Sequence, residues 1–443
     1  MLGSQAASSP DHPASLPKAT VHWSEFSLLI VILLVFSEGI LPRLVPGGDG
    51  DDGSAFLRLL WLPIYGVAFL GLIWKFQDVA RACLRLPFLM ILIVICAASF
   101  TWSIEPGLTQ RRSLAIVMTT AAGLYVGTRY DWQTMLRALG FAWCIIAIVA
   151  FMTGALNPSF GRMQEVHIGA WQGLYFEKNQ LGGSMALAAT FAGFLAIMDQ
   201  KFRRIWIGFL GLAIVLVLLS TSKTALLGLL LGLGILAVCA WMKRGIAIGL
   251  ITLWGAVILV GFGGAVLVIA PEVVFAILGR DMTLTGRTDI WIALVDYIQQ
   301  RPLFGYGYGV FWSPESGPGN WVRETLEWDA PTAHNGWLEV ALSLGLIGLL
   351  FLALDFVMTL WRAVMAAVNT WVGVFALAFL AQFFLFSLSE SSSLQQNSIV
   401  WVIYVAIAAK LAMRPKGVAV TKPAPHHPKM QMPVVQAVSS DPA

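Results

Sequence analysis

The amino-acid sequence predicts an all-α integral membrane protein whose helices pack into one bundle. Of the 443 residues, 58% are hydrophobic and only 12% are charged, and the mean hydropathy is +0.77. A soluble globular protein carries about twice that share of charged residues. The apolar residues are also gathered into segments close to the ~20 residues that a helix needs to cross a bilayer. We therefore predict a polytopic helical bundle that forms a single domain over 24–413.

About twelve transmembrane helices are expected. Residues 1–23 are polar and rich in Ser and Pro, and 414–443 are also polar, so we predict a disordered tail at each end. A long region with more polar residues, 271–335, separates the ninth span from the tenth. The twelve apolar segments are 26–41, 57–74, 86–100, 112–128, 138–154, 181–198, 204–220, 223–242, 245–270, 336–361, 368–388 and 397–413.

The basic residues predict the orientation, because short cytoplasmic loops of membrane proteins collect Lys and Arg. With the N-terminus inside, most of the 28 basic residues fall on the cytoplasmic side, including those of the short loops 201–204 and 243–244. Both tails then face the cytoplasm, and the region 271–335 faces outward. The net charge of +4 is small and spread along the chain, so nucleic acid is not an expected partner.

Some basic residues remain on the outward side, where orientation does not require them. Helices packed as a bundle could bring several of them around one outward cavity. Such a cavity would suit an anion at the membrane surface, such as a lipid-linked diphosphate, because Arg can bind phosphate through two hydrogen bonds and Lys supplies a point charge. The alternative is that each side chain reaches lipid headgroups separately. These candidates are Arg111, Arg112, Arg162, Lys178, Lys223 and Arg287.

His334 is the main candidate for a catalytic base. It lies where the outward region meets an apolar helix, so it could reach both water and a membrane-bound substrate, and histidine can accept a proton near neutral pH. The alternative is that Pro331 and Thr332 begin and cap the helix, with His334 only lining its first turn. Asn335 and Glu339 lie four residues apart on one helix face. Glu339 is a second candidate base or an orienting carboxylate, and Asn335 a supporting residue.

A second helix is expected just after Arg287. Its first residues would present the Arg287 guanidinium and the free amides of the helix N-terminus to an anion. The alternative is an arginine that faces solvent beside a capping Thr285 or Thr288. The apolar positions that recur at helical spacing are 290, 291, 294, 297 and 298.

Other polar motifs indicate no metal or nucleotide. The glycines of 305–309 serve turns and close backbone approach, since no strand precedes them and no helix follows, as a dinucleotide motif requires. The Asp-x-Asp pattern at 49–51 lies in G-G-D-G-D-D-G, which is more typical of a solvated acidic turn. The four cysteines show no disulfide or metal-ligand spacing. Glu390 begins a polar outward loop and is a candidate supporting residue.

At these residues the sequence resembles the superfamily of bacterial O-antigen ligases and O-antigen or exopolysaccharide polymerases. The ligase-type pattern of His, then Asn, nine residues, Gly, two residues and Gly is matched by His334, Asn335, Gly345 and Gly348. The other segments that resemble this superfamily are F-E-K-N-Q-L-G (176–182), S-T-S-K-T (220–224), T-G-R (285–287) and P-L-F-G-Y-G-Y-G (302–309).

The resemblance implies a GT-C-like glycosyltransferase of the bacterial inner membrane that needs no metal or cofactor. Its donor would be a glycan linked to a polyprenyl diphosphate such as undecaprenyl diphosphate, and its active site would face the periplasm. Lys223 and Arg287 would then hold the donor diphosphate, and His334 would activate the acceptor hydroxyl. Lys223 departs from the Arg that many members have there, which weakens the argument for two-point binding of phosphate at this position.

The implied reaction has two forms. The first is polymerisation of lipid-linked repeat units into exopolysaccharide or O-antigen. The second is ligation of a finished glycan to lipid A-core or another acceptor, and the histidine pattern fits both. Membrane lipids and other polysaccharide export proteins are further expected partners. A transporter or flippase is a third interpretation, but the chain shows no internal repeat and its polar residues gather on one side.

Overall fold

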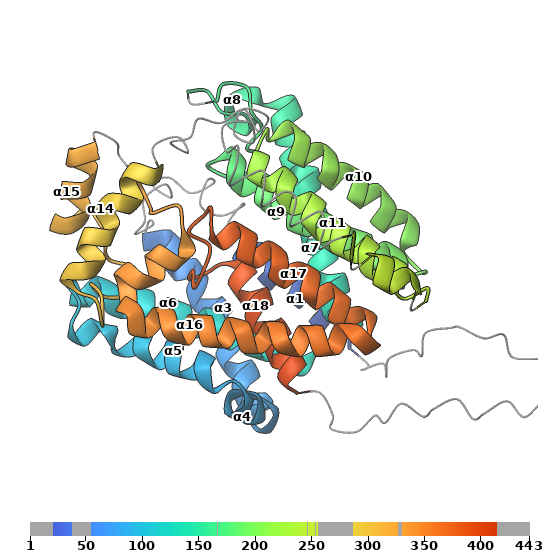
Figure 1. Ribbon diagram of the computed structural model, residues 1–443, viewed down its shortest axis with the longest axis horizontal. Coiled ribbons are helices and arrows are strands. Elements are labelled where there is room, and N and C mark those ends of the chain that lie inside the picture. The colour runs from blue at the N-terminus through green and yellow to red at the C-terminus, as the bar shows by residue number, and fades with distance from the viewer. Residues whose placement is uncertain are drawn as a thin grey trace, which may run out of the picture. The chain divides into compact units, whose positions relative to one another are not determined.

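The computed structural model describes residues 21–37, 55–165, 167–245, 247–252, 254–255, 287–326 and 330–413. This part of the chain is almost entirely helical and contains no β-strand, which confirms the predicted all-α class (Figure 1). The helices are α1 (Trp23–Phe36), α3 (Ala55–Trp74), α4 (Phe76–Arg85), α5 (Pro87–Ala98), α6 (Pro106–Arg129), α7 (Trp132–Leu156), α8 (Pro158–Gly161), α9 (Lys178–Met198), α10 (Arg203–Leu219), α11 (Lys223–Met242), α14 (Arg287–Gln300), α15 (Gly317–Leu326), α16 (Gly336–Asn369), α17 (Trp371–Ser387) and α18 (Ile399–Ala412), with a 3-10 turn at Ser99–Thr101.

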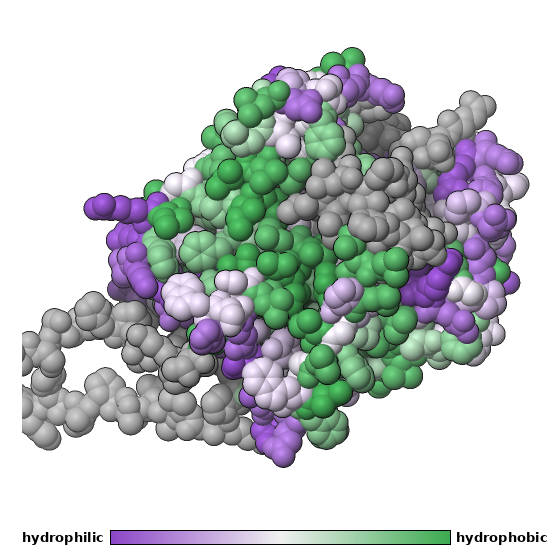
Figure 2. Space-filling model, turned by 180° about the vertical axis from the view of Figure 1, so that it is seen from behind, coloured by the Kyte–Doolittle hydropathy of each residue, from purple (hydrophilic) through white to green (hydrophobic). Residues whose placement is uncertain are grey.

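Several of these helices can cross a membrane. Within the described residues, α7, α9, α11 and α16 are long and apolar enough, and α3 with α4 qualifies as a bent pair, while α1, α5, α17 and α18 are apolar but shorter. Figure 2 shows a broad hydrophobic area on one face, with most hydrophilic residues toward its edges. The chain is therefore a multi-pass membrane protein, as predicted.

The predicted number of twelve spans stays a prediction. Residues 38–54 and most of 245–270 lie outside the described residues, as do the acidic turn at 49–52 and both expected tails over 1–20 and 414–443. Every other predicted apolar segment contains a helix in the part of the chain that the structure describes.

Helix α17 lies in the middle of the main hydrophobic core. Phe375, Phe379 and Phe383 recur every four residues, so they share one face of the helix, and all three are buried. The ring of Phe191 on α9 lies 4.6 Å from that of Phe375, and the ring of Tyr404 on α18 lies 4.8 Å from that of Phe383, measured between centroids. Helix α17 also packs against α11 and α16. Helix α17 is thus packed against helices from both halves of the chain.

The basic residues predicted to be cytoplasmic gather at one end of the bundle. Arg137 of α7 pairs with Asp199 after α9 at 2.6 Å, and Arg129 of α6 pairs with Glu25 of α1 at 2.9 Å. These contacts join helix ends that the charge pattern assigns to the same side. Others at this end run from Arg85, Lys243, Arg362 and Lys410 to backbone carbonyls of neighbouring helix ends.

Helix α4 lies between the second and third predicted apolar segments, where the sequence predicts no span. It is bent by 91° from α3. Val79 and Ala82 on one side of it are buried, whereas Phe76 and Leu84 are exposed. Such a short amphipathic helix has no continuous apolar run, so a search for spans overlooks it.

The predicted span 336–361 corresponds to a longer helix that buries the carboxyl group of Asp355. Helix α16 has 34 residues and continues well past the predicted end at 361, which places Asp355 in its interior. The side chain is only 2% exposed and accepts a hydrogen bond of 2.7 Å from the hydroxyl of Tyr404. A hydrogen bond of this kind offsets part of the cost of burying a carboxyl group.

The described part of the outward region has a small hydrophobic core of its own. This core joins α14, α15 and the segment between them to the start of α16. Arg323 of α15 fastens it further, because its guanidinium donates hydrogen bonds to the carbonyl oxygens of Trp312 and Ala330 at 2.5 and 3.2 Å. The buried residues are Ile290, Leu294, Tyr306, Phe311, Trp312, Val322, Ala330, Ala333 and Leu342.

The outward region is tied to the bundle at a break in α16. Gly345 has non-helical angles (φ 66°, ψ −168°). A break in an apolar helix removes backbone hydrogen bonds, and backbone N–H and C=O groups left unpaired away from water are energetically costly. The segment 302–307 supplies new partners on both sides of the break. The bonds run from Leu346 N to Pro302 O, Ile347 N to Leu303 O, Tyr306 N to Leu342 O and Gly307 N to Ser343 O, at 2.7–3.3 Å.

Two facing glycines allow this approach. A Cβ atom on Gly345 would lie 2.2 Å from the carbonyl carbon of Leu303, and one on Gly305 would lie 2.4 Å from the carbonyl oxygen of Leu342. Both glycines have positive φ, a conformation that other residues adopt only at a cost. The structural role predicted for the glycines of 305–309 is confirmed at Gly305.

Replacing Gly345 by alanine should loosen the outward region. Because of the positive φ and the clash with Leu303, we expect Gly345→Ala to lower the free energy of unfolding by at least about 2 kcal/mol. Thermal unfolding in detergent and protease cleavage within 302–309 would measure this. The control is Gly234→Ala in α11, where an added Cβ meets nothing within 4 Å. Equal stability of the two variants would contradict the role given to Gly345.

Candidate active site

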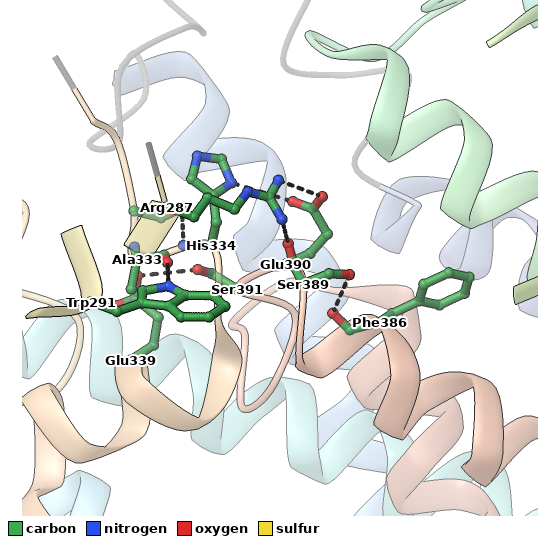
Figure 3. Close-up of polar contacts among 10 residues, drawn as sticks. Arg287, Trp291, Ala333, His334, Glu339, Phe386, Ser389, Glu390 and Ser391 are labelled. Carbon is green, nitrogen blue, oxygen red and sulfur yellow. Dashed lines mark hydrogen bonds and ion pairs between the residues drawn. The ribbon is translucent and has the colours of Figure 1, made fainter. Parts of the chain in front are cut away.

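Three segments that are distant in the sequence meet around the carboxylate of Glu390 (Figure 3). They are the start of α14, the residues before α16 and the turn after α17. Glu390 Oε1 lies 3.3 Å from an NH2 nitrogen of Arg287, and Oε2 lies 3.5 Å from Nδ1 of His334. The side chains of Arg287, His334 and Glu390 are 13%, 11% and 26% exposed. The structure therefore brings three of the predicted site residues together in a partly buried position.

Helix α14 holds Arg287 by anchoring the turn that follows. Ile290 and Leu294 are fully buried. Trp291, one turn after Arg287 on the same face, donates a hydrogen bond of 2.9 Å from Nε1 to the carbonyl of Ala333. Arg287 itself donates to the carbonyl of Ser389 at 2.5 Å. The predicted amphipathic helix is thus confirmed, and it begins at Arg287.

Asn335, and not Pro331 or Thr332, caps α16. The helix begins at Gly336, and the Asn335 side chain accepts hydrogen bonds from the second and third helix amides, Trp337 N and Leu338 N, at 3.0 and 3.2 Å. Our alternative that Pro331 and Thr332 begin and cap the helix is therefore wrong. The cap leaves His334 just outside the helix.

His334 is held in a restricted conformation beside this cap. Its φ is +47°, in the left-handed region that non-glycine residues seldom adopt. The residue is 9% exposed, and its amide donates to the hydroxyl of Thr332 at 3.4 Å. Backbone strain of this kind is common at functional sites, where the surrounding structure holds it in place.

Glu339 fixes the loop before α16. Its Oε1 accepts hydrogen bonds from the amide of Ala333, Nε1 of Trp312 and Oγ of Ser391, at 2.6, 3.0 and 3.1 Å. A carboxylate oxygen with three donors is suited to holding backbone in position. Of the two roles predicted for Glu339, the geometry favours the orienting carboxylate.

Lys223 lies at the same end of the bundle as Glu390. Helices α11 and α17 run antiparallel, because Gly228 lies against Phe386 and, one turn further, Gly232 lies against Gln382. By the same antiparallel spacing, the position one turn before Gly228 on α11, next to Lys223, is level with Glu390. Lys223 opens α11 with an exposed side chain, after the capping residue Ser222.

Lys178 also lies at this end of the bundle, because its side chain contacts the turn before α11. Its Nζ lies 3.4 Å from the hydroxyl of Thr221, two residues before Lys223. His167 is also close, since partial burial and then the positive charge of Lys178 lower the pKa of its imidazole. The sequence does not single out His167, because no local pattern shows that the loop before α9 folds back to bring this imidazole near Lys178.

The remaining candidate arginines have different surroundings. Arg112 is buried and donates to the carbonyl of Gly309, so it helps to fasten the 302–309 segment. Arg162 donates to the carbonyl of Gly154 at 2.9 Å and lies over the ring of Trp171, 5.1 Å from its centroid. Arg111 is exposed. Their assignment to a diphosphate site stays a prediction.

Comparison with known proteins gives two similarities. Residues 208–353 match a family model described as O-Antigen ligase. The chain is also 26% identical over 312 residues to the "Exopolysaccharide production protein ExoQ" of Rhizobium meliloti (strain 1021), which covers 67% of this chain and 67% of that protein. The family match includes Lys223, Arg287 and His334, whereas Glu390 lies beyond it.

Removing the cap should destabilise the start of α16. We expect Asn335→Ala to lower the free energy of unfolding by about 1 kcal/mol, because two helix amides lose their acceptor. Asn335→Asp should keep most of the stability, since aspartate also caps helices well. Thermal unfolding in detergent would measure both variants. Thr370→Ala, which removes the cap of α17 at the other end of the bundle, calibrates the cost of losing a cap. An Asn335→Ala protein as stable as the wild type would contradict this assignment.

Proposed function

Because the chain belongs to the superfamily of O-antigen ligases and O-antigen or exopolysaccharide polymerases, we propose that it is a membrane glycosyltransferase with a lipid-linked donor. The donor is a glycan on a polyprenyl diphosphate, such as undecaprenyl diphosphate, in the bacterial inner membrane, and the reaction takes place at the periplasmic face. The observation that carries this proposal is the meeting of His334 and Arg287 at one partly buried carboxylate. A proton acceptor and a fixed cation at one place are what such a transfer requires.

Arg287 and Lys223 hold the donor diphosphate in this proposal. Arg287 is fixed by the carbonyl of Ser389, so its guanidinium is oriented before substrate binds. Lys223 and the positive end of the α11 helix dipole add positive charge at the same end of the bundle. These groups stabilise the charge that develops on the diphosphate as it leaves, so the reaction as proposed uses protein cations where other enzymes use a metal.

His334 acts as the general base. It removes the proton from an acceptor hydroxyl while the oxygen of that hydroxyl forms a bond to the anomeric carbon of the donor glycan. The bond from that carbon to the diphosphate oxygen breaks, and its electron pair leaves with the diphosphate. Glu339 keeps the loop before α16 in place, and Asn335 keeps His334 outside the helix, so both support the base without touching the reacting atoms.

We propose polymerisation as the form of the reaction, with the acceptor sugar belonging to a second lipid-linked repeat unit. The name of the Rhizobium relative, an exopolysaccharide production protein, supports this form. The second candidate is ligation to lipid A-core or another final acceptor, and the description of the matched family as O-antigen ligase supports it.

Substitution of His334 or Arg287 tests the site. With purified protein in detergent and polyprenyl-diphosphate-linked repeat units, His334→Ala should slow transfer by about 10²–10⁴-fold, the usual contribution of a general base. Arg287→Ala should slow it by about 10²–10³-fold through lost charge stabilisation. Gel analysis of glycan length would measure both. Arg301→Ala, which removes an exposed arginine of the outward region, should retain activity.

The same assay separates the two reactions. A ladder of lengthened lipid-linked glycan from donor alone is the result expected for a polymerase. Transfer that occurs only after a lipid A-core acceptor is added would favour the ligase. Full activity of both His334→Ala and Arg287→Ala would contradict the proposed site.

A further inference from the structure

Glu390 faces the two proposed functional residues at once, and its backbone is fixed. Its amide donates to the carbonyl of Phe386 at 2.8 Å, which continues the last turn of α17. One carboxylate oxygen points to the guanidinium of Arg287 and the other to the imidazole of His334 (Figure 3). The carboxylate therefore lies where an anion bound by Arg287 would place its oxygen atoms.

In this position the carboxylate competes with the donor diphosphate for the guanidinium of Arg287. Phosphate oxygens and carboxylate oxygens bind the same guanidinium nitrogens. Two anions at one partly buried cation repel each other more strongly than they would in water. When the diphosphate binds Arg287, the contact of 3.3 Å between Arg287 and Glu390 has to weaken or open.

Release from Arg287 changes what Glu390 can do for His334. The present distance of 3.5 Å between Oε2 and Nδ1 is at the outer limit of a hydrogen bond. A carboxylate freed from the arginine can approach Nδ1 and keep the proton on that nitrogen. The lone pair of the ring is then on Nε2, ready for the acceptor hydroxyl. The same carboxylate stabilises the imidazolium that forms when Nε2 takes the proton.

We propose that Glu390 is a positioning residue that exchanges partners, pairing with Arg287 in the free enzyme and with His334 when the donor diphosphate is bound. This inference rests on the proposed function, since it requires a diphosphate at Arg287. Glu390 transfers no proton itself. The acceptor proton moves to Nε2 of His334 and afterwards to solvent, while the diphosphate leaves with the electron pair of the broken carbon–oxygen bond.

The exchange predicts opposite effects on binding and on turnover. Glu390→Gln has nearly the same shape but no negative charge to compete for Arg287. It should bind undecaprenyl diphosphate about three- to tenfold more tightly than the wild type, a change of the size expected for a partly exposed ion pair. It should also transfer glycan at least about tenfold more slowly, because the base loses part of its contribution of about 10²–10⁴. A residue that only supports the fold would weaken both.

The experiment uses the purified full-length protein in detergent. Undecaprenyl diphosphate is titrated while tryptophan fluorescence is followed, and turnover is measured separately with lipid-linked repeat units. Glu390→Asp keeps the charge with a shorter reach, so it should bind the diphosphate like the wild type but turn over at least about tenfold more slowly. Glu324→Gln on α15 removes one exposed carboxylate from the outward region. It should match the wild type in both measurements.

Equal or weaker binding by Glu390→Gln, or turnover at the wild-type rate, would overturn the exchange of partners. If the Gln variant does not purify as a folded protein, Glu390→Asp decides, and weaker binding by this variant would show that the carboxylate builds the site and does not compete for it. Failure of the proposed function looks different. In that case the wild type does not bind undecaprenyl diphosphate, or Arg287→Ala binds it equally well.

Discussion

The break in α16 is the constraint on which the arrangement of the outward region depends. An apolar helix that loses hydrogen bonds at Gly345 must find new partners for its backbone, and the segment 302–307 provides them. These hydrogen bonds hold the segment 302–307, which follows α14, against α16, which begins just after His334. Arg287 and His334 are therefore held by two elements that are joined at one backbone contact, which explains how residues 47 positions apart in the sequence keep a constant relation.

The hydrophobic core supplies the third part of the site. Helix α17 packs against α9, α11, α16 and α18, so the position of the turn after it depends on both halves of the bundle. Glu390 leaves this turn toward Arg287 and His334. The same packing places the start of α11, with Lys223, at that end of the bundle. The proposed site for a membrane-bound diphosphate thus lies where several helices of the described part of the chain begin or end.

Much of the fold could be predicted from the sequence because hydropathy is a local property. The helices that cross the bundle match the apolar segments wherever the structure describes them. Helix α4 was overlooked because a short amphipathic helix has no apolar run. The break at Gly345 was also invisible, since the residues around it are continuously apolar and the partners that permit the break lie about 40 residues earlier.

The site was predicted in part. His334 and Arg287 stood out because a histidine and outward arginines are unusual beside apolar helices. Their common contact with Glu390 depends on tertiary packing, which no local pattern reports. The same limit applies to Arg112 and Arg162. Their positions in the sequence resemble that of Arg287, but the fold turns Arg112 toward the carbonyl of Gly309 and Arg162 toward that of Gly154.

One measurement tests the central claim most directly, a cryo-electron microscopy structure of the full-length protein with undecaprenyl diphosphate bound. We predict density for the diphosphate within hydrogen-bonding distance of the Arg287 guanidinium and on the side of Lys223. The imidazole of His334 should face the space beside the terminal phosphate, where the glycan of a donor would be attached. Diphosphate density elsewhere on the protein, with Arg287 still paired to Glu390, would contradict the site described above.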